Sequence, residues 1–252
     1  MTIIQARDVV KTYDTGKIKV KALRGVSLEI EKGEMVAIMG PSGCGKTTLL
    51  NALSGIDDID SGSIRIEGRD ISSMSDNDKT NHRAERMGFI FQAYNLMPVL
   101  TAVENVELPL LVSGAKRGIA RKKALDALGT VGLEDWAKHK PSEMSGGQQQ
   151  RVTIARSLVN DPVIVWADEP TGNLDSEISG QIMDLLLTLN KEMEQTYVLV
   201  THDPKVGRKA NRIVRMENGT ITNGHERPAS AEDVVSQGPH RTFHSRAAPV
   251  TR

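Results

Sequence analysis

The 252-residue chain carries 32 basic and 32 acidic residues and no formal net charge, whereas a domain that binds duplex nucleic acid usually shows a basic excess. Aromatic residues make up 3% of the chain and Cys44 is the single cysteine, which argues against a base-stacking platform and excludes an internal disulfide framework. Because the sequence shows neither a signal peptide nor an apolar run near the roughly 20 residues that span a bilayer, we expect a soluble, cytoplasmic protein that binds no nucleic acid.

The N-terminal part of the chain is predicted to form two strands. Alternation of apolar and polar residues indicates strands at residues 3–10 and 18–30. We expect Tyr13 to lie in the polar turn between them. An exposed ring there could stack on the base of a nucleotide, but an ordinary half-buried tyrosine fits the sequence equally well, so both interpretations stay open.

A phosphate-binding motif follows the two strands. Residues 34–39 are an apolar run of strand length, and residues 47–53 have helical spacing. Between them, Gly40–Thr47 fits G-x-x-x-x-G-K-[ST], the P-loop. Its glycines let successive backbone N–H groups point at one anion, and the helix N-terminus adds partial positive charge. We expect Lys46 to reach the β- and γ-phosphates and the Thr47 hydroxyl to take one position on Mg²⁺.

The next segments lead to a second strand region and a helical insertion. A turn is expected at residues 57–62, strands at 63–67 and 87–92, and a surface loop with a short helix at 70–86. The 87–92 strand ends at Gln92.

Residues 93–160 have a different pattern. Helical periodicity recurs at 101–110, 117–131 and 146–158, and the strong strand signals lie outside this segment. We interpret it as a helical insertion in an α/β core, in which Ile119, Leu125, Leu128 and Val131 form a buried stripe.

Two carboxylates follow a buried strand. Residues 163–167 are an apolar run typical of a central parallel strand, and Asp168 and Glu169 stand at its C-terminal end. Ligands bind in the crevice at that end of open α/β sheets. With a P-loop in the same chain, Asp168 is the expected Mg²⁺-side carboxylate and Glu169 is placed to polarise a water molecule.

The C-terminal part completes the core. A helix is predicted at 176–193, a buried strand at 196–201 and a closing hairpin at 212–221. His202 follows the buried strand, where it could hydrogen-bond a γ-phosphate or simply cap the strand. Apolar periodicity stops at Thr222, so we expect a disordered tail over 222–252.

A second candidate anion site lies within the helical insertion. Ser145 is a natural helix N-cap, and two glycines follow it before Gln148. Taken alone, this segment would more simply be an ordinary capped helix start. Because one nucleotide needs only one P-loop, a second cradle in the same chain suggests a nucleotide held by another molecule.

These motifs, in this order over residues 3–221, resemble those of the ATP-binding-cassette (ABC) ATPases. The matching segments are Tyr13 (A-loop), Gly40–Thr47 (Walker A), Gln92 (Q-loop), Ser145–Gln148 (signature), Asp168 and Glu169 (Walker B), Asn173–Asp175 (D-loop) and His202 (switch histidine). The resemblance implies ATP contacts at Tyr13, Gly40, Pro41, Ser42, Gly43, Cys44, Gly45, Lys46, Thr47 and Thr48. It implies Mg²⁺ ligation by Thr47, Gln92 and Asp168, and catalysis by Glu169, His202 and Gln92. It also implies contacts to the ATP of a partner subunit from Ser145, Gly146, Gly147, Gln148 and Asp175.

The resemblance also implies an architecture and partners. The expected fold is α/β, a P-loop NTPase RecA-like core with an antiparallel β subdomain and an inserted α-helical subdomain at about 93–160, all within a 1–221 ATPase domain. Two cassettes would pair head to tail, as a homodimer when nucleotide binds. Within the family the chain is most similar to the ATPases of macrolide-export and lipoprotein-release systems, which implies an integral membrane permease as partner and a peripheral location at the cytoplasmic face of the inner membrane.

Three other functions remain open. A non-transport ABC protein acting on DNA or ribosomes usually carries a coiled-coil insert or a second cassette, and neither is visible. A small-molecule P-loop kinase would not need Ser145–Gln148, and Glu169 favours water as the phosphoryl acceptor. A regulatory ABC ATPase that moves no solute is not distinguished by the sequence.

Overall fold

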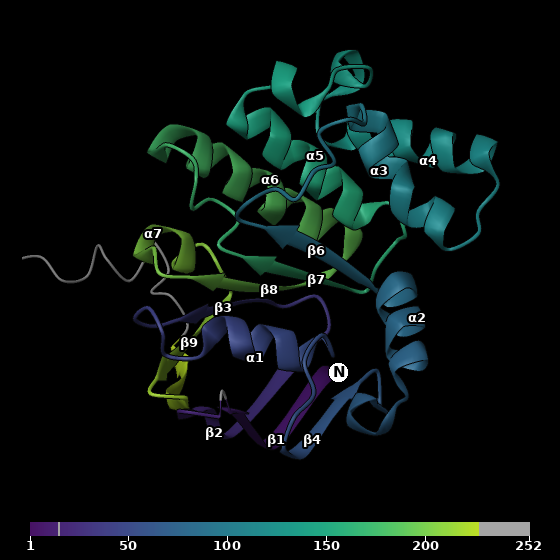
Figure 1. Ribbon diagram of the computed structural model, residues 1–252. Coiled ribbons are helices and arrows are strands. Elements are labelled where there is room, and N and C mark those ends of the chain that lie inside the picture. Colours follow the sequence, from purple (N-terminus) through teal and green to yellow (C-terminus); the bar gives the residue numbers. More distant parts are fainter. Residues whose placement is uncertain (15, 227–252) are drawn as a thin grey trace, which may run out of the picture.

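The computed structural model describes residues 1–14 and 16–226 (Figure 1). Its strands are β1 (Thr2–Asp14), β2 (Lys19–Glu31), β3 (Met35–Met39), β4 (Ser61–Ile66), β5 (Arg69–Asp70), β6 (Met87–Phe91), β7 (Ile164–Asp168), β8 (Thr196–Thr201), β9 (Arg212–Glu217) and β10 (Thr220–Glu226). Its helices are α1 (Lys46–Leu53), α2 (Asp76–Arg86), α3 (Ala102–Val112), α4 (Arg117–Thr130), α5 (Gly146–Leu158), α6 (Ser176–Met193) and α7 (Pro204–Gly207), with short 3₁₀ segments at Ile71–Ser73, Glu134–Trp136 and Pro141–Glu143.

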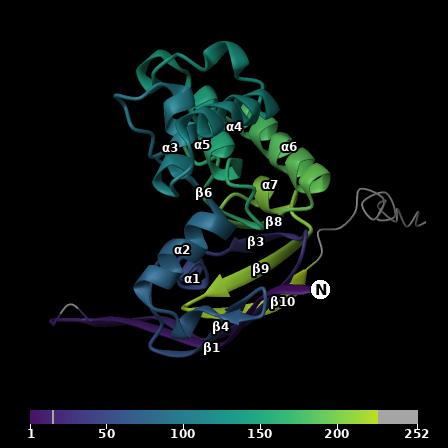
Figure 2. The same ribbon diagram turned by 90° about the vertical axis from the view of Figure 1, so that its right-hand side faces the viewer.

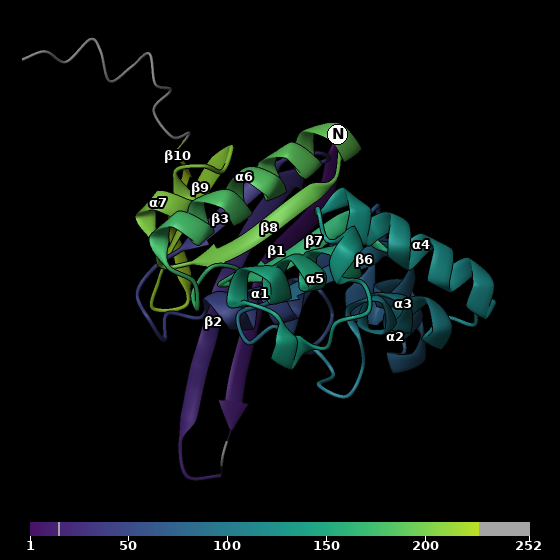
Figure 3. The ribbon, with the colours of Figure 1, turned by 90° about the horizontal axis from the view of Figure 1, so that it is seen from above.

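The strands form two sheets. An antiparallel sheet has the order β2-β1-β4-β5, and a six-stranded sheet has the order β10-β9-β3-β8-β7-β6. In the second sheet β9, β3, β8, β7 and β6 are parallel, and only β10 runs against its neighbour. Figures 2 and 3 show the β1–β2 hairpin extending well beyond the six-stranded sheet. These two sheets and the helical insertion confirm the predicted fold class.

The central strands are buried because both faces of the parallel sheet are covered. All five residues of β3 are buried, and successive side chains point to opposite faces. Met35, Ala37 and Met39 join an apolar cluster with α3 to α6. Val36 and Ile38 join a second cluster with α1 and the antiparallel sheet. The P-loop helix and the helical insertion therefore cover opposite faces of one sheet (Figure 1).

The buried stripe predicted for α4 is correct at Leu128 and Val131 and wrong at its other two residues. Ile119 and Leu125 are 55% and 43% exposed. The buried face consists of Ala120, Ala124 and Leu128, and Val131 continues it. This face has the i, i+4 spacing of a helix stripe, and its small side chains let α4 lie close to α3 and α5.

Two predicted boundaries also differ from the structure. β1 continues to Asp14 and pairs Tyr13 with Val20, so Tyr13 lies in the strand and not in the turn. β10 continues to Glu226, five residues beyond the expected end of the domain at Ile221. The remainder of the expected tail, 227–252, lies outside the described residues.

One glycine sets the distance between the sheet and the helical insertion. A Cβ added to Gly88 of β6 would lie 2.2 Å from the backbone oxygen of Ser157 in α5. We expect Gly88→Ala to lower the free energy of unfolding by about 1–3 kcal/mol, because two backbone segments must move apart. Urea denaturation measures the loss. Gly118→Ala in α4 is the control, because a Cβ added there meets nothing within 4 Å. This variant should be neutral or slightly stabilising. Equal stability of the two variants would contradict the steric explanation.

Candidate functional site

The P-loop curls around the ammonium group of its own lysine. Gly45 adopts φ 104° at the N-cap of α1, and Gly43 adopts φ 77°, conformations that favour glycine. Lys46 is buried, and its Nζ donates hydrogen bonds to the carbonyl oxygens of Gly40 at 2.9 Å and Pro41 at 3.0 Å. Backbone N–H groups at the start of α1 and a fixed ammonium together form a cradle for an anion.

A cavity of about 470 Å³ opens over this loop, within the usual size range of small-ligand sites. Eight of the residues predicted to bind or hydrolyse ATP line it, namely Tyr13, Ser42, Gly43, Gly45, Lys46, Thr47, Thr48 and Glu169. Cys44 is buried behind the loop instead. The structure thus brings Tyr13, the P-loop and the Glu169 carboxylate to one cavity.

The structure brings together two of the three predicted magnesium ligands. Thr47 Oγ1 lies 3.3 Å from each carboxylate oxygen of Asp168, which stands at the end of β7. Burial raises the pKa of the Asp168 carboxyl, and a neighbouring divalent cation would favour its ionised form. A hydroxyl and a carboxylate next to phosphates are the oxygen donors that Mg²⁺ takes in P-loop sites, so these residues fit the ion.

Gln92 is placed differently from the prediction. Its side-chain amide donates to Asn173 Oδ1 at 3.1 Å, and Asn173 returns a hydrogen bond to the Gln92 carbonyl at 2.9 Å. This reciprocal pair ties the end of β6 to the loop after Glu169. The structure does not join Gln92 to Thr47 and Asp168, because its amide is directed to Asn173, and its roles in metal binding and catalysis stay predictions.

Glu169 and His202 form a pair at the edge of the cavity. Glu169 Oε1 lies 2.7 Å from His202 Nδ1, and the Glu169 side chain is 16% exposed. Glu169 has φ 47°, an uncommon backbone conformation for a non-glycine residue. Two backbone hydrogen bonds hold it: the Glu169 N–H donates to the Val200 carbonyl, and the Glu169 carbonyl accepts from the Gly172 N–H. The sequence left open whether His202 hydrogen-bonds a γ-phosphate or caps the strand. In the structure its imidazole contacts the Glu169 carboxylate, and its catalytic role stays a prediction.

The signature segment forms a capped helix start away from this cavity. The Ser145 hydroxyl accepts from the Gln148 N–H at 3.3 Å, and the Gln148 side chain accepts from the Ser145 N–H at 2.9 Å, a capping box. No residue of 145–148 is among the described residues that line the cavity over the P-loop. The predicted trans contacts of Ser145, Gly146, Gly147 and Gln148 therefore need a second molecule and stay predictions.

Asp175 has a structural role in the single chain. Its Oδ1 accepts from the N–H groups of Glu177 and Ile178 at 3.0 and 2.9 Å, which caps α6. The predicted contact of Asp175 with a partner's ATP remains untested.

Two structural features that support the site were not predicted from the sequence. The β9–β10 turn, Asn218–Gly219, has positive φ at both residues and lines the cavity, and Gly219 N–H donates to the Cys44 carbonyl at 3.0 Å. The Asn-Gly pair is a known hairpin signal, but its contact with the P-loop is long-range.

Gln150 is fully buried, and its amide donates to the carbonyl of Pro170, which ties the signature helix to the segment after Glu169.

Comparisons with known proteins identify the family of the chain. The family model described as "ABC transporter" matches residues 23–172. The chain is 44% identical over 219 residues to the lipoprotein-releasing system ATP-binding protein LolD of Saccharophagus degradans, covering 87% of this chain and 96% of that protein. It is 45% identical over 225 residues to the macrolide export ATP-binding/permease protein MacB of Syntrophobacter fumaroxidans, covering 88% of this chain and 31% of that longer protein.

A solved structure supports the same fold. The dimeric post-hydrolysis state of the ATP-binding cassette MJ0796, bound to ADP and phosphate, has a TM-score of 0.82 and 43% identity, covering 90% of this chain and all of that one. Family match, sequence identity and fold all indicate the same family. The chain belongs to the ABC transporter family.

Proposed function

We propose that the chain is the ATP-hydrolysing subunit that energises an export-type or mechanotransmission permease from the cytoplasmic face of the inner membrane. The observation that carries the proposal is the shared cavity of Lys46, Thr47 and Glu169, with His202 fixing Glu169. None of the helices within residues 1–14 and 16–226 is both long and apolar enough to cross a membrane.

The residues of the cavity divide the chemistry between them. A triphosphate binds where backbone N–H groups of the P-loop converge, and the Lys46 ammonium exchanges its two carbonyl acceptors for phosphate oxygens. Glu169 accepts a proton from the water whose oxygen attacks the γ-phosphorus, and the bond to ADP breaks. His202 holds Glu169 in one orientation through the 2.7 Å contact. Mg²⁺, held by Thr47 and Asp168, would neutralise phosphate charge.

The second half of each site comes from a second subunit in this proposal. The capped start of α5 lies outside the cavity of its own chain, and its N–H groups and partial positive charge suit a phosphate. MJ0796 is dimeric in its ADP- and phosphate-bound state, which supports the pairing of two chains here. Two identical chains related by a two-fold axis would then form two equivalent sites.

A groove between the core and the helical insertion suits the permease. A cavity of about 500 Å³ lies between α2, β6, α3 and α5, and Figures 1 and 2 show α2 and α3 on the same side of the molecule. Its rim carries Ile56 and Val112, exposed at 46% and 78%. Asn95, in the loop that follows β6, also lines the groove. We propose that a permease helix packs here.

Cross-linking tests the groove directly. With Cys44 replaced by Ser, we expect Val112→Cys to cross-link to an integral membrane protein in native membranes, because that position is at the rim of the groove. Met193→Cys, at the far end of α6 and 41% exposed, is the matched control. Equal cross-linking from both positions, or from the control alone, would place the permease elsewhere. Immunoblotting of the cross-linked adducts measures the result.

The proposed function has its own test. ATP hydrolysis by the purified chain should release phosphate and leave no phosphorylated small molecule, which separates an ATPase from a kinase. Purification of the Glu169→Gln form from membranes with ATP, followed by mass spectrometry, should recover a permease. Recovery of a cell-wall or division complex without a transport permease would favour the regulatory alternative.

A further inference from the structure

We propose that Asp57, presented by the turn Asp57–Asp60, is a positioning residue that holds the Tyr13 ring in the orientation in which it stacks on the nucleotide base. The inference rests on the proposed function, because it needs ATP in the cavity that Tyr13 lines. It deepens that function by naming what fixes the aromatic side chain.

The turn is hydrogen-bonded to the end of β1 residue by residue. Tyr13 Oη donates to Asp57 Oδ2 at 2.5 Å, and Lys11 Nζ donates to the Asp58 carbonyl at 2.6 Å. Asp60 Oδ2 accepts from the Thr12 N–H at 2.7 Å, and the Asp60 N–H donates to the Val10 carbonyl at 2.8 Å. Four consecutive residues of β1 are thereby fixed to one short turn.

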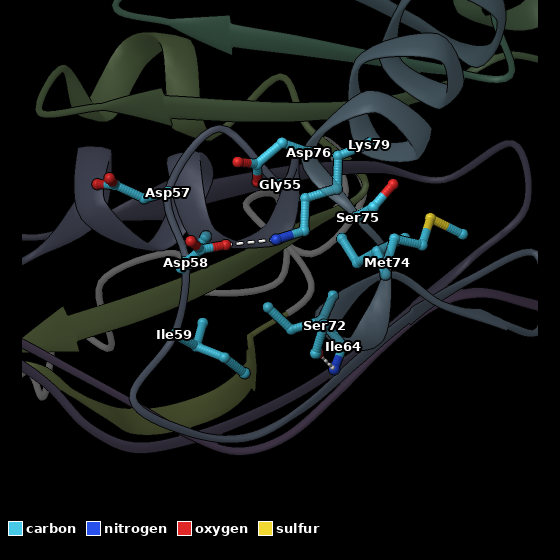
Figure 4. Close-up of a pocket in the computed structure, with 12 residues that line it drawn as sticks. Gly55, Asp57, Asp58, Ile59, Ile64, Ser72, Met74, Ser75, Asp76 and Lys79 are labelled. Carbon is cyan, nitrogen blue, oxygen red and sulfur yellow. Dashed lines mark hydrogen bonds and ion pairs between the residues drawn. The ribbon is translucent and has the colours of Figure 1, made fainter.

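The turn is itself anchored on its other side. Asp58 is ion-paired with Lys79 of α2, whose side chain is only 10% exposed, and Arg83 Nη1 donates to the Gly55 carbonyl at 2.6 Å. Figure 4 shows Asp58 directed to Lys79, while Asp57 lies on the opposite side of the turn with its carboxylate pointing away from Lys79. Two neighbouring aspartates thus face two ways, one toward α2 and one toward Tyr13.

The ring of Tyr13 is held at its hydroxyl and on one face. The Lys11 ammonium lies over the ring, 5.2 Å from its centroid, a cation–π contact. Burial together with the Asp57 contact raises the pKa of Tyr13, so the hydroxyl stays protonated and can donate. With one face covered, a base stacks on the other. Fixing the ring in advance removes the entropy cost of ordering it when the base binds.

Steady-state kinetics of the full chain test the proposal. We expect Asp57→Ala to raise the KM for ATP by roughly three- to tenfold, the effect of one lost hydrogen bond, with kcat within about twofold of wild type. Asp57→Asn keeps an acceptor oxygen and should restore most of the KM. The inhibition constant of inorganic tripolyphosphate, which has no base, should not change, because the phosphate cradle is untouched. Asp14→Ala, which removes a nearby carboxylate paired with Lys19, is the control and should leave KM unchanged.

A double-mutant cycle separates positioning from folding. Tyr13→Phe removes only the hydroxyl and should raise KM as much as Asp57→Ala does, and the double variant should be no worse than either single one. The inference is overturned if the two effects multiply, if tripolyphosphate inhibition weakens in parallel, or if Asp57→Ala leaves KM unchanged. Tyr13→Leu tests whether Tyr13 contacts the base at all. If its KM for ATP is unchanged, Tyr13 does not contact the base and this inference fails with that role. If its KM is raised but Asp57→Ala has no effect, only the inference about Asp57 is overturned.

Discussion

The Glu169→Gln variant is expected to bind ATP with unchanged affinity and to lose about 10²- to 10⁴-fold in turnover, the range for removing a general base. Glutamine keeps the size of the side chain and a hydrogen-bonding group for His202, but it cannot accept the proton of the attacking water. The γ-phosphate contacts then persist, so the variant should accumulate as an ATP-bound dimer. Phosphate release and size-exclusion chromatography with ATP measure the two effects.

The control for this variant is Glu192→Gln, which changes an exposed glutamate near the end of α6 and should retain full activity. His202→Ala should reduce turnover by a smaller factor, because it removes the orientation of Glu169 and leaves the carboxylate in place. Full ATPase activity of Glu169→Gln would show that another group accepts the proton.

The Ser145→Arg variant is expected to abolish turnover while each chain still binds ATP. Ser145 lies outside the cavity of its own chain and caps the helix whose N-terminus is proposed to face the partner's γ-phosphate. A long cationic side chain there removes the cap and fills the space between the subunits. Equilibrium binding of a fluorescent ATP analogue and a phosphate-release assay measure the two properties.

Forced pairing with Lys46→Ala tests which chain Ser145 serves. A tandem dimer of one Ser145→Arg chain and one Lys46→Ala chain keeps one intact site if the signature acts on the partner's ATP, because the native P-loop then faces the native Ser145. We expect measurable activity from this dimer and none from either variant paired with itself. Ser73→Arg, at an exposed serine in the segment before α2, is the control. An inactive mixed dimer would show that Ser145 serves its own chain's nucleotide.

The parts of the fold that the sequence predicted correctly depend on local patterns. Continuous apolar runs identified β7 and β8, and the bounds predicted for α6 agree with the structure, because Asp175 caps its first turn. The P-loop was predictable because its glycines, lysine and threonine are adjacent in the chain. These features need no knowledge of what packs against them.

The features that the sequence did not predict depend on tertiary contacts. In α4 two alanines are buried and two large apolar residues are exposed, because close packing against α3 and α5 selects small side chains over large ones. Gln92 turns to Asn173, 81 positions later in the chain. Asp57 looked like an ordinary turn residue, and its contact with Tyr13 exists only because the turn lies against β1.

The ammonium of Lys46 closes its own loop through hydrogen bonds to backbone carbonyls, and it is also the group expected to bind the negatively charged phosphates. A phosphate that binds there competes with the carbonyl oxygens of Gly40 and Pro41, so the gain is the difference between an anionic acceptor and two neutral ones. The same nitrogen therefore stabilises the conformation of the empty loop and binds the phosphate. Any chemical change that neutralises this lysine, acetylation included, would remove the shape of the loop together with its attraction for phosphate.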